Sequence, residues 1–388
     1  MTTHLFSDKR KPATPHPGYT TYAEIATDKL TENVRLLKQQ AGLIDIMAVV
    51  KADAYGHGMS AMATFLANAG ISHFLVATLD EALQLRTLLP EVQILVASPP
   101  HSKNLPVYAE KRLHASVTSA SVAESVKAAA KNGVPLHVHA KIDTGMNRLG
   151  MDASLALPIL QELIDCPNLH LDGIWSHLAT AGSEDKTFAI QQIETAYQIL
   201  EQLPDFQGYF HVGNSGTLLN HRDRIGRHPK ELIRLGGALL GIPASQKLAQ
   251  QFGLQPVMTL KSQVTHIKKL DVGDTVSYGR TWKATEPTQI AIVGAGYADG
   301  YPSALSGKGS VQINQQTYPI VGRVCMDMLM VDIGIDNSTI NPGDEVILFG
   351  SNHANIYDLA ITAGLVHYEI CCRIPLRVPR RFTQSSQR

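Results

Sequence analysis

The sequence predicts an α/β protein built as a (β/α)8 barrel of the TIM type followed by a C-terminal, mainly β domain. Its 388 residues suit two domains better than one. Short apolar runs alternate with amphipathic segments as far as residue 241, and β-branched segments take over after residue 249. We therefore expect a flexible tail at 1–18, the barrel at 19–250 and the β domain at 251–388.

The barrel prediction rests on eight apolar runs of strand length, most of them followed by a segment with helical spacing of apolar residues. The candidate strands are 46–50, 73–78, 92–97, 113–118, 136–142, 170–176, 209–213 and 232–240. The clearest helical patterns are 79–89, 119–131, 153–165 and 184–202. Eight such units over about 220 residues match a barrel of this kind, for which ~250 residues is typical. A doubly wound open sheet gives a similar alternation, so that alternative stays open.

The second domain is predicted from segments rich in Val, Ile and Thr. They lie at 257–270, 275–284, 289–296, 310–314, 318–322, 329–333 and 345–349. Turn sequences such as Asn341-Pro342-Gly343-Asp344 separate them, and one helical pattern occurs near 356–366. The early run 19–26 also alternates like a strand, and we expect that it can pair with this domain.

Composition argues against several classes of protein. Lys plus Arg and Asp plus Glu both number 34, and this balance gives no support for binding to nucleic acid or to a membrane surface. The four cysteines lack metal-ligand spacing and fit reduced thiols, so we expect no metal and a cytoplasmic protein. No stretch has the pattern of a secretory signal or the length of a transmembrane helix.

Lys51 is the most informative single residue. It ends the apolar run 46–50 and is followed by Tyr55, Gly56 and Gly58. A lysine at the mouth of a buried strand is partly desolvated, which lowers its pKa and makes its amine available as a nucleophile. A tyrosine and two glycines suit a loop that holds an anion such as a phosphate. Together they predict a pyridoxal-phosphate site, although position alone also fits an ordinary surface lysine.

Other distinctive residues follow the ends of other candidate strands, where barrel enzymes place their chemistry. In chain order they are Lys141, Arg148, His177, Asn214, Ser215, Arg234, Gly236 and Gly237. Taken singly, the glycines could serve tight turns and the histidine could be a core residue. Their convergence at one end of a barrel is more informative than any one of them.

These residues also carry a family resemblance. The segment 48–58, AVVKADAYGHG, resembles the pyridoxal-phosphate signature of alanine racemases. Further motifs recur in the family's order at 141–150, 214–215, 234–236, 276–279, 296–302, 322–327, 368–369 and 377–380. The resemblance covers nearly everything after residue 19. It implies fold type III architecture, a (β/α)8 barrel with a β domain, in agreement with the independent prediction above.

The resemblance implies a role for each matched residue of the barrel. Lys51 would bind pyridoxal phosphate as an imine, and Arg234 would face its pyridine nitrogen, where a permanent positive charge disfavours a proton. That arrangement suits a racemase, whose carbanion must be reprotonated quickly. The implied phosphate and cofactor ligands are Tyr55, Asn214, Ser215, Gly236, Gly237 and Tyr368.

Racemisation needs proton-transfer groups on opposite faces of the substrate carbon. The resemblance assigns Lys51 to the D isomer and Tyr278 to the L isomer. A phenol is a weak acid in water, and the family links this tyrosine through the position of His177 to Arg234. The remaining implied substrate-side residues are Arg148 for the carboxylate, with Met326, Tyr297 and Asp327, and Lys141 as a lysine that many members carbamylate.

Tyr278, Tyr297, Met326 and Asp327 fall in the β domain. In the family these positions reach the active site of the other subunit, which implies a homodimer with shared sites. The implied activity is interconversion of L-alanine and D-alanine, supplying D-alanine for peptidoglycan.

Two departures keep other substrates open. Many members carry an acid at the place of Gly182 and an arginine at the place of Ser303, both in the entry corridor. A serine racemase or one of broader specificity is therefore an alternative. A fold type III decarboxylase would need an acid in place of Arg234, and a pyridoxal-phosphate carrier would resemble the barrel alone.

Overall fold

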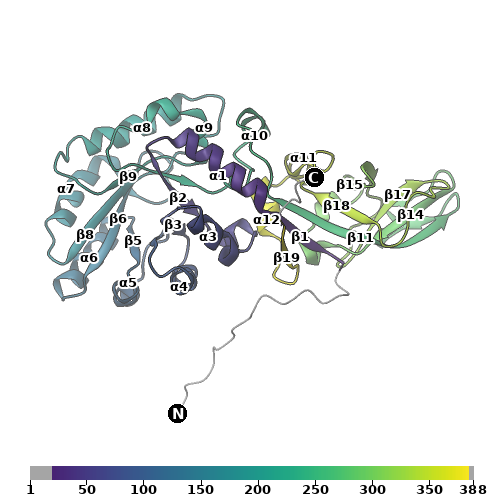
Figure 1. Ribbon diagram of the computed structural model, residues 1–388, viewed down its shortest axis with the longest axis horizontal. Coiled ribbons are helices and arrows are strands. Elements are labelled where there is room, and N and C mark those ends of the chain that lie inside the picture. The colour runs from purple at the N-terminus through teal and green to yellow at the C-terminus, as the bar shows by residue number, and fades with distance from the viewer. Residues whose placement is uncertain (1–19, 384–388) are drawn as a thin grey trace, which may run out of the picture. The chain divides into compact units, whose positions relative to one another are not determined.

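The computed structural model describes residues 20–383, so the expected tail at 1–18 lies outside the described residues. The chain divides into two compact units (Figure 1). One unit runs from Lys29 to Gln255, and the other combines residues up to Asp28 with those from Pro256 onward. The barrel unit thus ends at Gln255 rather than at residue 250, and the N-terminal strand is part of the β unit.

The barrel unit contains eight parallel strands in the order β10-β2-β3-β4-β5-β6-β8-β9. They are β2 (Asp45–Val49), β3 (His73–Val76), β4 (Gln93–Val96), β5 (His114–Val117), β6 (Leu136–Asp143), β8 (Leu169–Trp175), β9 (Tyr209–His211) and β10 (Leu232–Leu235). Parallel bridges Phe210–Glu231 and Asn214–Arg234 bring β9 to β10 and nearly close the ring. This closure excludes the doubly wound alternative and confirms the predicted fold class.

Helices surround these strands, as Figure 1 shows. They are α1 (Thr27–Ala41), α3 (Met59–Asn68), α4 (Leu79–Leu88), α5 (Leu105–Glu110), α6 (Ala120–Lys131), α7 (Ala153–Ile164), α8 (Thr187–Leu200), α9 (Ser215–Asn220) and α10 (Gln246–Gln251). Each long helix buries one apolar stripe, such as Leu30, Val34 and Leu37 of α1. None of the described helices combines the length and the apolar character needed to cross a membrane.

The β unit is organised around β11 (Met258–Leu270), which pairs with β1, β14 and β18. The other strands of this sheet are β1 (Tyr22–Ala26), β14 (Thr288–Val293), β15 (Ser310–Ile313), β16 (Gln316–Pro319), β17 (Leu329–Gly334), β18 (Glu345–Phe349) and β19 (Arg380–Thr383). A small ladder, β12 (Thr275–Val276) with β13 (Trp282–Lys283), and two helices, α11 (Ile356–Ala363) and α12 (His367–Cys372), complete the unit.

Several predicted strands lose one or more terminal residues in the structure, and the run 318–322 belongs to a strand only as far as Pro319. Two further runs differ more. The run 232–240 is a strand only over Leu232–Leu235, because the chain then turns through the glycines that follow. The run 275–284 is interrupted by a turn at Tyr278–Arg280, where Ser277 and Gly279 have φ of 67° and 73°. No regular strand accommodates two residues with positive φ.

Candidate active site

Lys51 stands at the carboxyl end of β2 and opens a turn with unusual backbone geometry, α2 (Lys51–Tyr55). Ala52, Asp53, Ala54 and Tyr55 have φ of 52°, 54°, 52° and 54°. This left-handed conformation costs a non-glycine residue roughly 1–2 kcal/mol, and such residues normally occur singly. Strained backbone persists where the surroundings fix it, and it clusters at functional sites.

Two carboxylates fix this turn. Glu81, in the first turn of α4, accepts hydrogen bonds from the amides of Ala52 at 2.7 Å, Ala77 at 2.7 Å and Thr78 at 3.1 Å. Asp53 accepts one from the amide of Met59 at 2.7 Å. Glu81 therefore ties the residue directly after Lys51 to the end of the neighbouring strand β3.

We expect Glu81→Ala to release the lysine turn. Each amide bond to a charged acceptor contributes about 1.5–3 kcal/mol. Glu81 is only half-buried, so water can replace part of its three bonds, and we expect the free energy of unfolding to fall by about 2–4 kcal/mol. Misplacement of a reacting group by about 1 Å can cost ~100-fold, so kcat should fall at least tenfold while the cofactor stays bound. Urea unfolding and steady-state kinetics measure both effects. Glu91→Ala is the control, since that carboxylate is exposed and lies 3.5 Å from Arg112; equal losses in both variants would contradict the assignment.

Arg234 lies at the centre of a buried hydrogen-bond network. Its guanidinium donates to the carbonyl oxygens of Ser176 at 2.7 Å, Val212 at 3.4 Å and His211. It also lies 3.3 Å from Nδ1 of His177 and 3.1 Å from Nδ1 of His211. A guanidinium can only donate, so both imidazole Nδ1 atoms accept and both rings carry their proton on Nε2.

These histidines are neutral. Burial, with Arg234 next, lowers the pKa of His177 to about 2. Burial also lowers the pKa of His211 and His139 well below the usual value. Nε2–H of His211 donates to Nδ1 of His139 at 2.8 Å. The rings therefore extend the network from Arg234 into the barrel lumen, and a side chain at Gly173 would collide with His139.

The predicted residues around Arg234 form a cationic cluster. The Lys141 amine lies 4.7 Å above the Trp175 ring, and the Arg234 guanidinium lies 5.1 Å from the same ring. Burial, with Arg234 and then Arg148, lowers the pKa of Lys141 to about 8. Lys51 and Arg148 also act electrostatically on His177. Four positive groups at one end of the barrel suit an anionic ligand.

The structure also brings together part of the predicted phosphate site. Oγ of Ser215 accepts from the amides of Gly236 at 3.4 Å and Ala238 at 3.3 Å. A side chain at Gly236 would lie 2.7 Å from the hydroxyl of Tyr55, so the glycine permits this approach. Asn214 caps α9 through a bond from the amide of Thr217, and Gly237 follows in the same turn as Gly236. Hydroxyls and turn amides of this kind can bind a phosphate.

The remaining predicted residues belong to the β unit. Tyr278 is 73% exposed and follows Ser277, whose φ of 67° and ψ of −176° are nearly exclusive to glycine. The amide of Tyr297 donates to the carbonyl of Cys325 at 3.0 Å, and Ser277 Oγ donates to that of Arg323 at 2.8 Å. The segments that carry Tyr278, Tyr297 and Met326 are thus joined. Tyr368 lies on α12 of the same unit.

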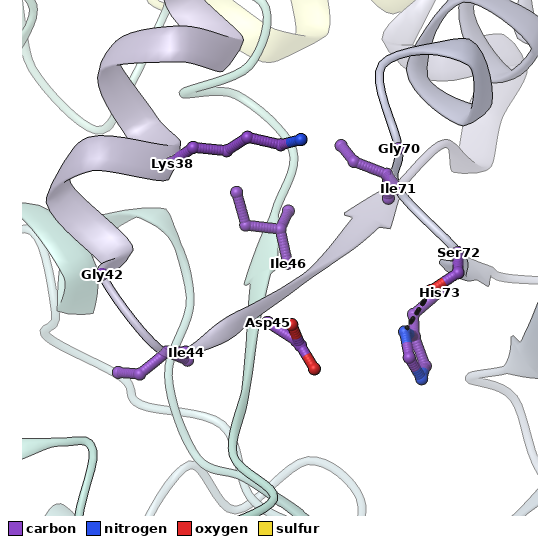
Figure 2. A pocket seen from close by; sticks show the side chains of 9 residues that line it. All are labelled: Lys38, Gly42, Ile44, Asp45, Ile46, Gly70, Ile71, Ser72 and His73. Atoms are coloured by element: carbon purple, nitrogen blue, oxygen red, sulfur yellow. Dashed lines mark hydrogen bonds between the residues drawn. The ribbon is translucent and has the colours of Figure 1, made fainter.

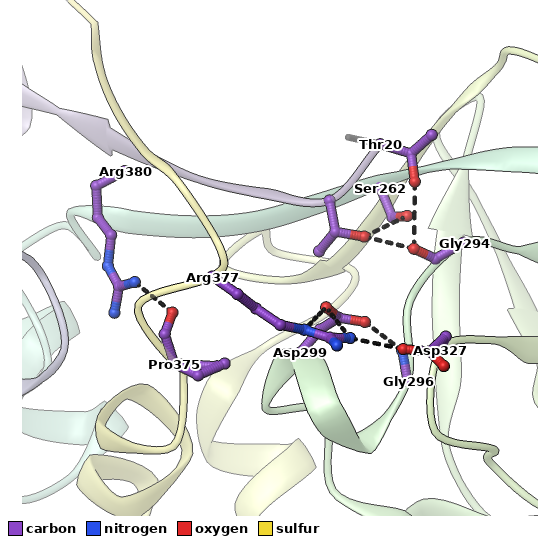
Figure 3. A network of polar contacts seen from close by, with 10 residues as sticks. Thr20, Ser262, Gly294, Gly296, Asp299, Asp327, Pro375, Arg377 and Arg380 are labelled. Carbon is purple, nitrogen blue, oxygen red and sulfur yellow. Dashed lines mark hydrogen bonds and ion pairs between the residues drawn. The ribbon is translucent and has the colours of Figure 1, made fainter. Parts of the chain in front are cut away.

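Arg377 anchors this region (Figure 3). Its guanidinium donates to Asp299 at 2.7 and 3.0 Å and to Asp327 at 2.8 Å. The other oxygen of Asp299 accepts from the amide of Gly296, next to Tyr297. Asp327, predicted near the substrate, therefore contributes to holding the segment that carries Tyr297.

One feature concerns the entry corridor predicted from the sequence, and another is a hollow that the sequence did not predict. A side chain at Gly182 would lie 2.4 Å from Cβ of Ala244, so this chain has no room there for the acid found in many family members.

A hollow of about 210 Å³ at the amino end of β2 is lined by Lys38, Asp45 and His73 among others (Figure 2). None of the predicted site residues lines it.

Comparison with known proteins identifies the family of the chain. The family profile of the alanine racemase N-terminal domain matches residues 25–243, and that of the C-terminal domain matches 257–382. The chain belongs to the alanine racemase family. Relatives named alanine racemase include those of Lactiplantibacillus plantarum, 36% identical over 89% of this chain and 92% of the relative, and Desulforamulus reducens, 34% identical over 92% and 98%.

Solved structures of alanine racemases share the whole fold. That of Clostridium difficile 630 has a TM-score of 0.88 at 31% identity, covering 95% of this chain and 97% of its own. That of Bartonella henselae, described with covalently bound pyridoxal phosphate, has a TM-score of 0.84 at 30% identity, covering 94% and 99%. The resemblance found in the sequence motifs is thereby confirmed.

Proposed function

We propose that the protein is a pyridoxal-phosphate-dependent racemase that interconverts L-alanine and D-alanine, working as a homodimer with shared active sites. The observation that carries the proposal is Arg234, a buried guanidinium at the place where a decarboxylase would need an acid. The free D-alanine formed would supply peptidoglycan synthesis. The composition and the four thiols favour a cytoplasmic enzyme.

The barrel residues fit pyridoxal phosphate. Tyr55, Ser215, Gly236 and Gly237 would hold its phosphate, and the amine of Lys51 would hold it covalently. When bound, the cofactor withdraws electrons from the α-carbon of an amino acid and acidifies its proton. Arg234 would face the ring nitrogen of the bound cofactor, since its carbonyl and imidazole partners hold the guanidinium in place.

Two groups would then move the α-proton. The Lys51 amine takes it from D-alanine, and the Tyr278 oxygen of a second copy of the chain takes it from L-alanine. His177 supports this second base, since its Nε2–H is left to donate to a phenolate oxygen. Tyr278, Tyr297 and Met326 are large apolar side chains exposed on the β unit, as residues of an interface between copies are. Arg148 would bind the substrate carboxylate, with Met326 beside it.

Lys141 is proposed to be carbamylated. Its neutral amine would attack carbon dioxide, form a carbamate and release one proton. A pKa of about 8 leaves about a tenth of the amines neutral at pH 7, several hundred-fold more than an ordinary lysine has. The buried Nε1–H of Trp175, in the ring beside Lys141, has no hydrogen-bond partner among the described residues and could donate to the new carboxylate.

We expect the activity to depend on carbon dioxide. Removing dissolved carbon dioxide should lower kcat severalfold and raise KM, and bicarbonate should restore both, because the carbamate would position Arg148. Labelled bicarbonate should give a carbamate signal in NMR spectra of the wild type but not of Lys141→Ala. A wild type without this signal, and with activity indifferent to bicarbonate, would exclude the modification.

The proposed function itself is tested by circular dichroism of L-alanine, L-serine and L-lysine incubated separately with protein loaded with pyridoxal phosphate. We expect the signal of L-alanine to decay much faster than the others. Faster decay of the L-serine signal would make serine the preferred substrate. The altered packing at Gly182 is the reason for including serine in the comparison. Release of carbon dioxide without racemisation would show that the protein is a decarboxylase. A protein that binds the cofactor but converts none of the three amino acids would favour a pyridoxal-phosphate carrier.

A further inference from the structure

Three potential metal ligands meet at the amino-terminal mouth of the barrel, at the opposite strand ends from Lys51. His114 lies on β5, His137 on β6 and Asp172 on β8, three adjacent strands in which His114 and His137 are register partners. Oδ2 of Asp172 lies 2.6 Å from Nδ1 of His137 and 3.3 Å from Nδ1 of His114. The three ligand atoms all lie within 4.8 Å of one another.

A β-bulge places the carboxylate there. The register between β6 and β8 passes from Val138–Leu171 to His139–Gly173, so Asp172 is the additional residue of β8. Neighbouring residues of a regular strand point to opposite faces, and a bulge can re-aim a side chain. Asp172 is thereby directed toward His137.

We propose that His114, His137 and Asp172 bind a divalent transition-metal cation of the Zn²⁺ class. Two imidazoles and a carboxylate are a donor set that zinc uses, with protein ligands at about 2.0–2.2 Å. A tetrahedron of that size has edges of about 3.3 Å, which is the present spacing of His114 and Asp172. The contact between His137 and Asp172, at 2.6 Å, would lengthen, and the two imidazole nitrogens already lie within 4.8 Å of each other.

The surroundings favour coordination. Nδ1 of His114 is buried and makes no hydrogen bond within the described chain, since its contact with Asp172 lacks hydrogen-bond geometry. His170 stacks on His137 with ring centroids 4.8 Å apart and fixes the ring plane. A cavity of about 270 Å³ borders all three ligands and leaves room for a water to complete the coordination. Lys230 also lines it and opposes a cation.

The hollow of Figure 2 provides an internal comparison. It offers one carboxylate, Asp45, and one imidazole, His73, whose Nδ1 is engaged by Ser72 at 3.1 Å. The proposed site instead collects three donors from consecutive strands. A cation bound there would cross-link β5, β6 and β8, and it would serve stability rather than catalysis, since catalytic residues of such barrels lie at the other end.

The test uses untagged, full-length holoenzyme that has been treated with chelator and dialysed. Calorimetric titration with ZnCl₂ should show one ion per chain, and Co²⁺ should give the visible absorption of a tetrahedral site. Zn²⁺ should raise the melting temperature, because it binds the folded state. His137→Ala and Asp172→Asn should each weaken binding by more than the roughly 10- to 100-fold that loss of a supporting partner costs, with racemase activity unchanged.

Matched variants locate the site. His170→Ala and Cys372→Ser should retain one bound ion, since neither supplies a ligand, and Lys230→Gln should bind Zn²⁺ more tightly because an opposing charge is removed. Absence of stoichiometric binding by the wild type overturns the proposal without reference to any variant. Undiminished binding in both His137→Ala and Asp172→Asn, or loss of it in Cys372→Ser, also overturns it.

Discussion

Replacing Lys51 with alanine is expected to abolish alanine racemisation in both directions, together with the visible absorbance of covalently bound cofactor. The amine is proposed both to hold pyridoxal phosphate and to move the proton of D-alanine, so its loss removes two functions at once. Loss of a positioned proton-transfer group alone costs about 10²–10⁴-fold. Absorbance spectra of the loaded protein and racemisation assays from each enantiomer measure the two effects separately.

The control is Lys103→Ala, which removes an exposed lysine of the same unit and should leave the spectrum and the rate unchanged. Lys51→Ala should still fold, because the carboxylates of Glu81 and Asp53 hold the turn through backbone amides rather than through the lysine side chain. A Lys51→Ala protein that retained the covalent spectrum would mean that another lysine carries the cofactor, and Lys141 would be the next to test.

The sequence was sufficient to predict the barrel because buried parallel strands have a simple signature. Each buried strand is a continuous apolar run, and a polar residue marks its carboxyl end. The sequence therefore predicts Lys51, Lys141, His177 and Arg234 at the carboxyl-terminal mouth of the barrel. The predicted last strand, 232–240, extends five residues beyond the observed end at Leu235. Leu235 and the residues up to Leu240 are apolar and buried whether they form a strand or a turn, so hydrophobicity alone could not mark the boundary.

Other features were inaccessible for definite physical reasons. The left-handed turn after Lys51 contains no glycine and, apart from Asp53, no residue type that favours positive φ, and a carboxylate distant in sequence, Glu81, helps to hold it. His139 and His211 are not among the predicted site residues. Each lies between two apolar residues of its predicted strand, and this alternation is the signal that could place both rings on the face opposite to those neighbours. Asp172 meets His137 through a register shift, which depends on pairing between strands and leaves no local pattern.

Tyr278→Phe is expected to bind cofactor normally and to racemise alanine about 10²–10⁴-fold more slowly. The rates from L-alanine and D-alanine should fall together, since the two enantiomers have equal free energy and the equilibrium constant is fixed. Racemisation rates therefore cannot identify which face has lost its base. The informative measurement is incorporation of solvent deuterium into each enantiomer, followed separately in deuterated water.

In this experiment D-alanine should still exchange its α-proton, because Lys51 can remove the proton and return a deuteron to the same face. L-Alanine should exchange slowly, since its proton points toward the missing phenol oxygen. Tyr318→Phe, which removes a hydroxyl bonded to Gln316 on the same unit, should behave as wild type. If Tyr278→Phe slowed exchange into both enantiomers equally, Tyr278 would be a positioning residue, and the strained turn at Ser277 would serve the interface between copies rather than a base on the L face.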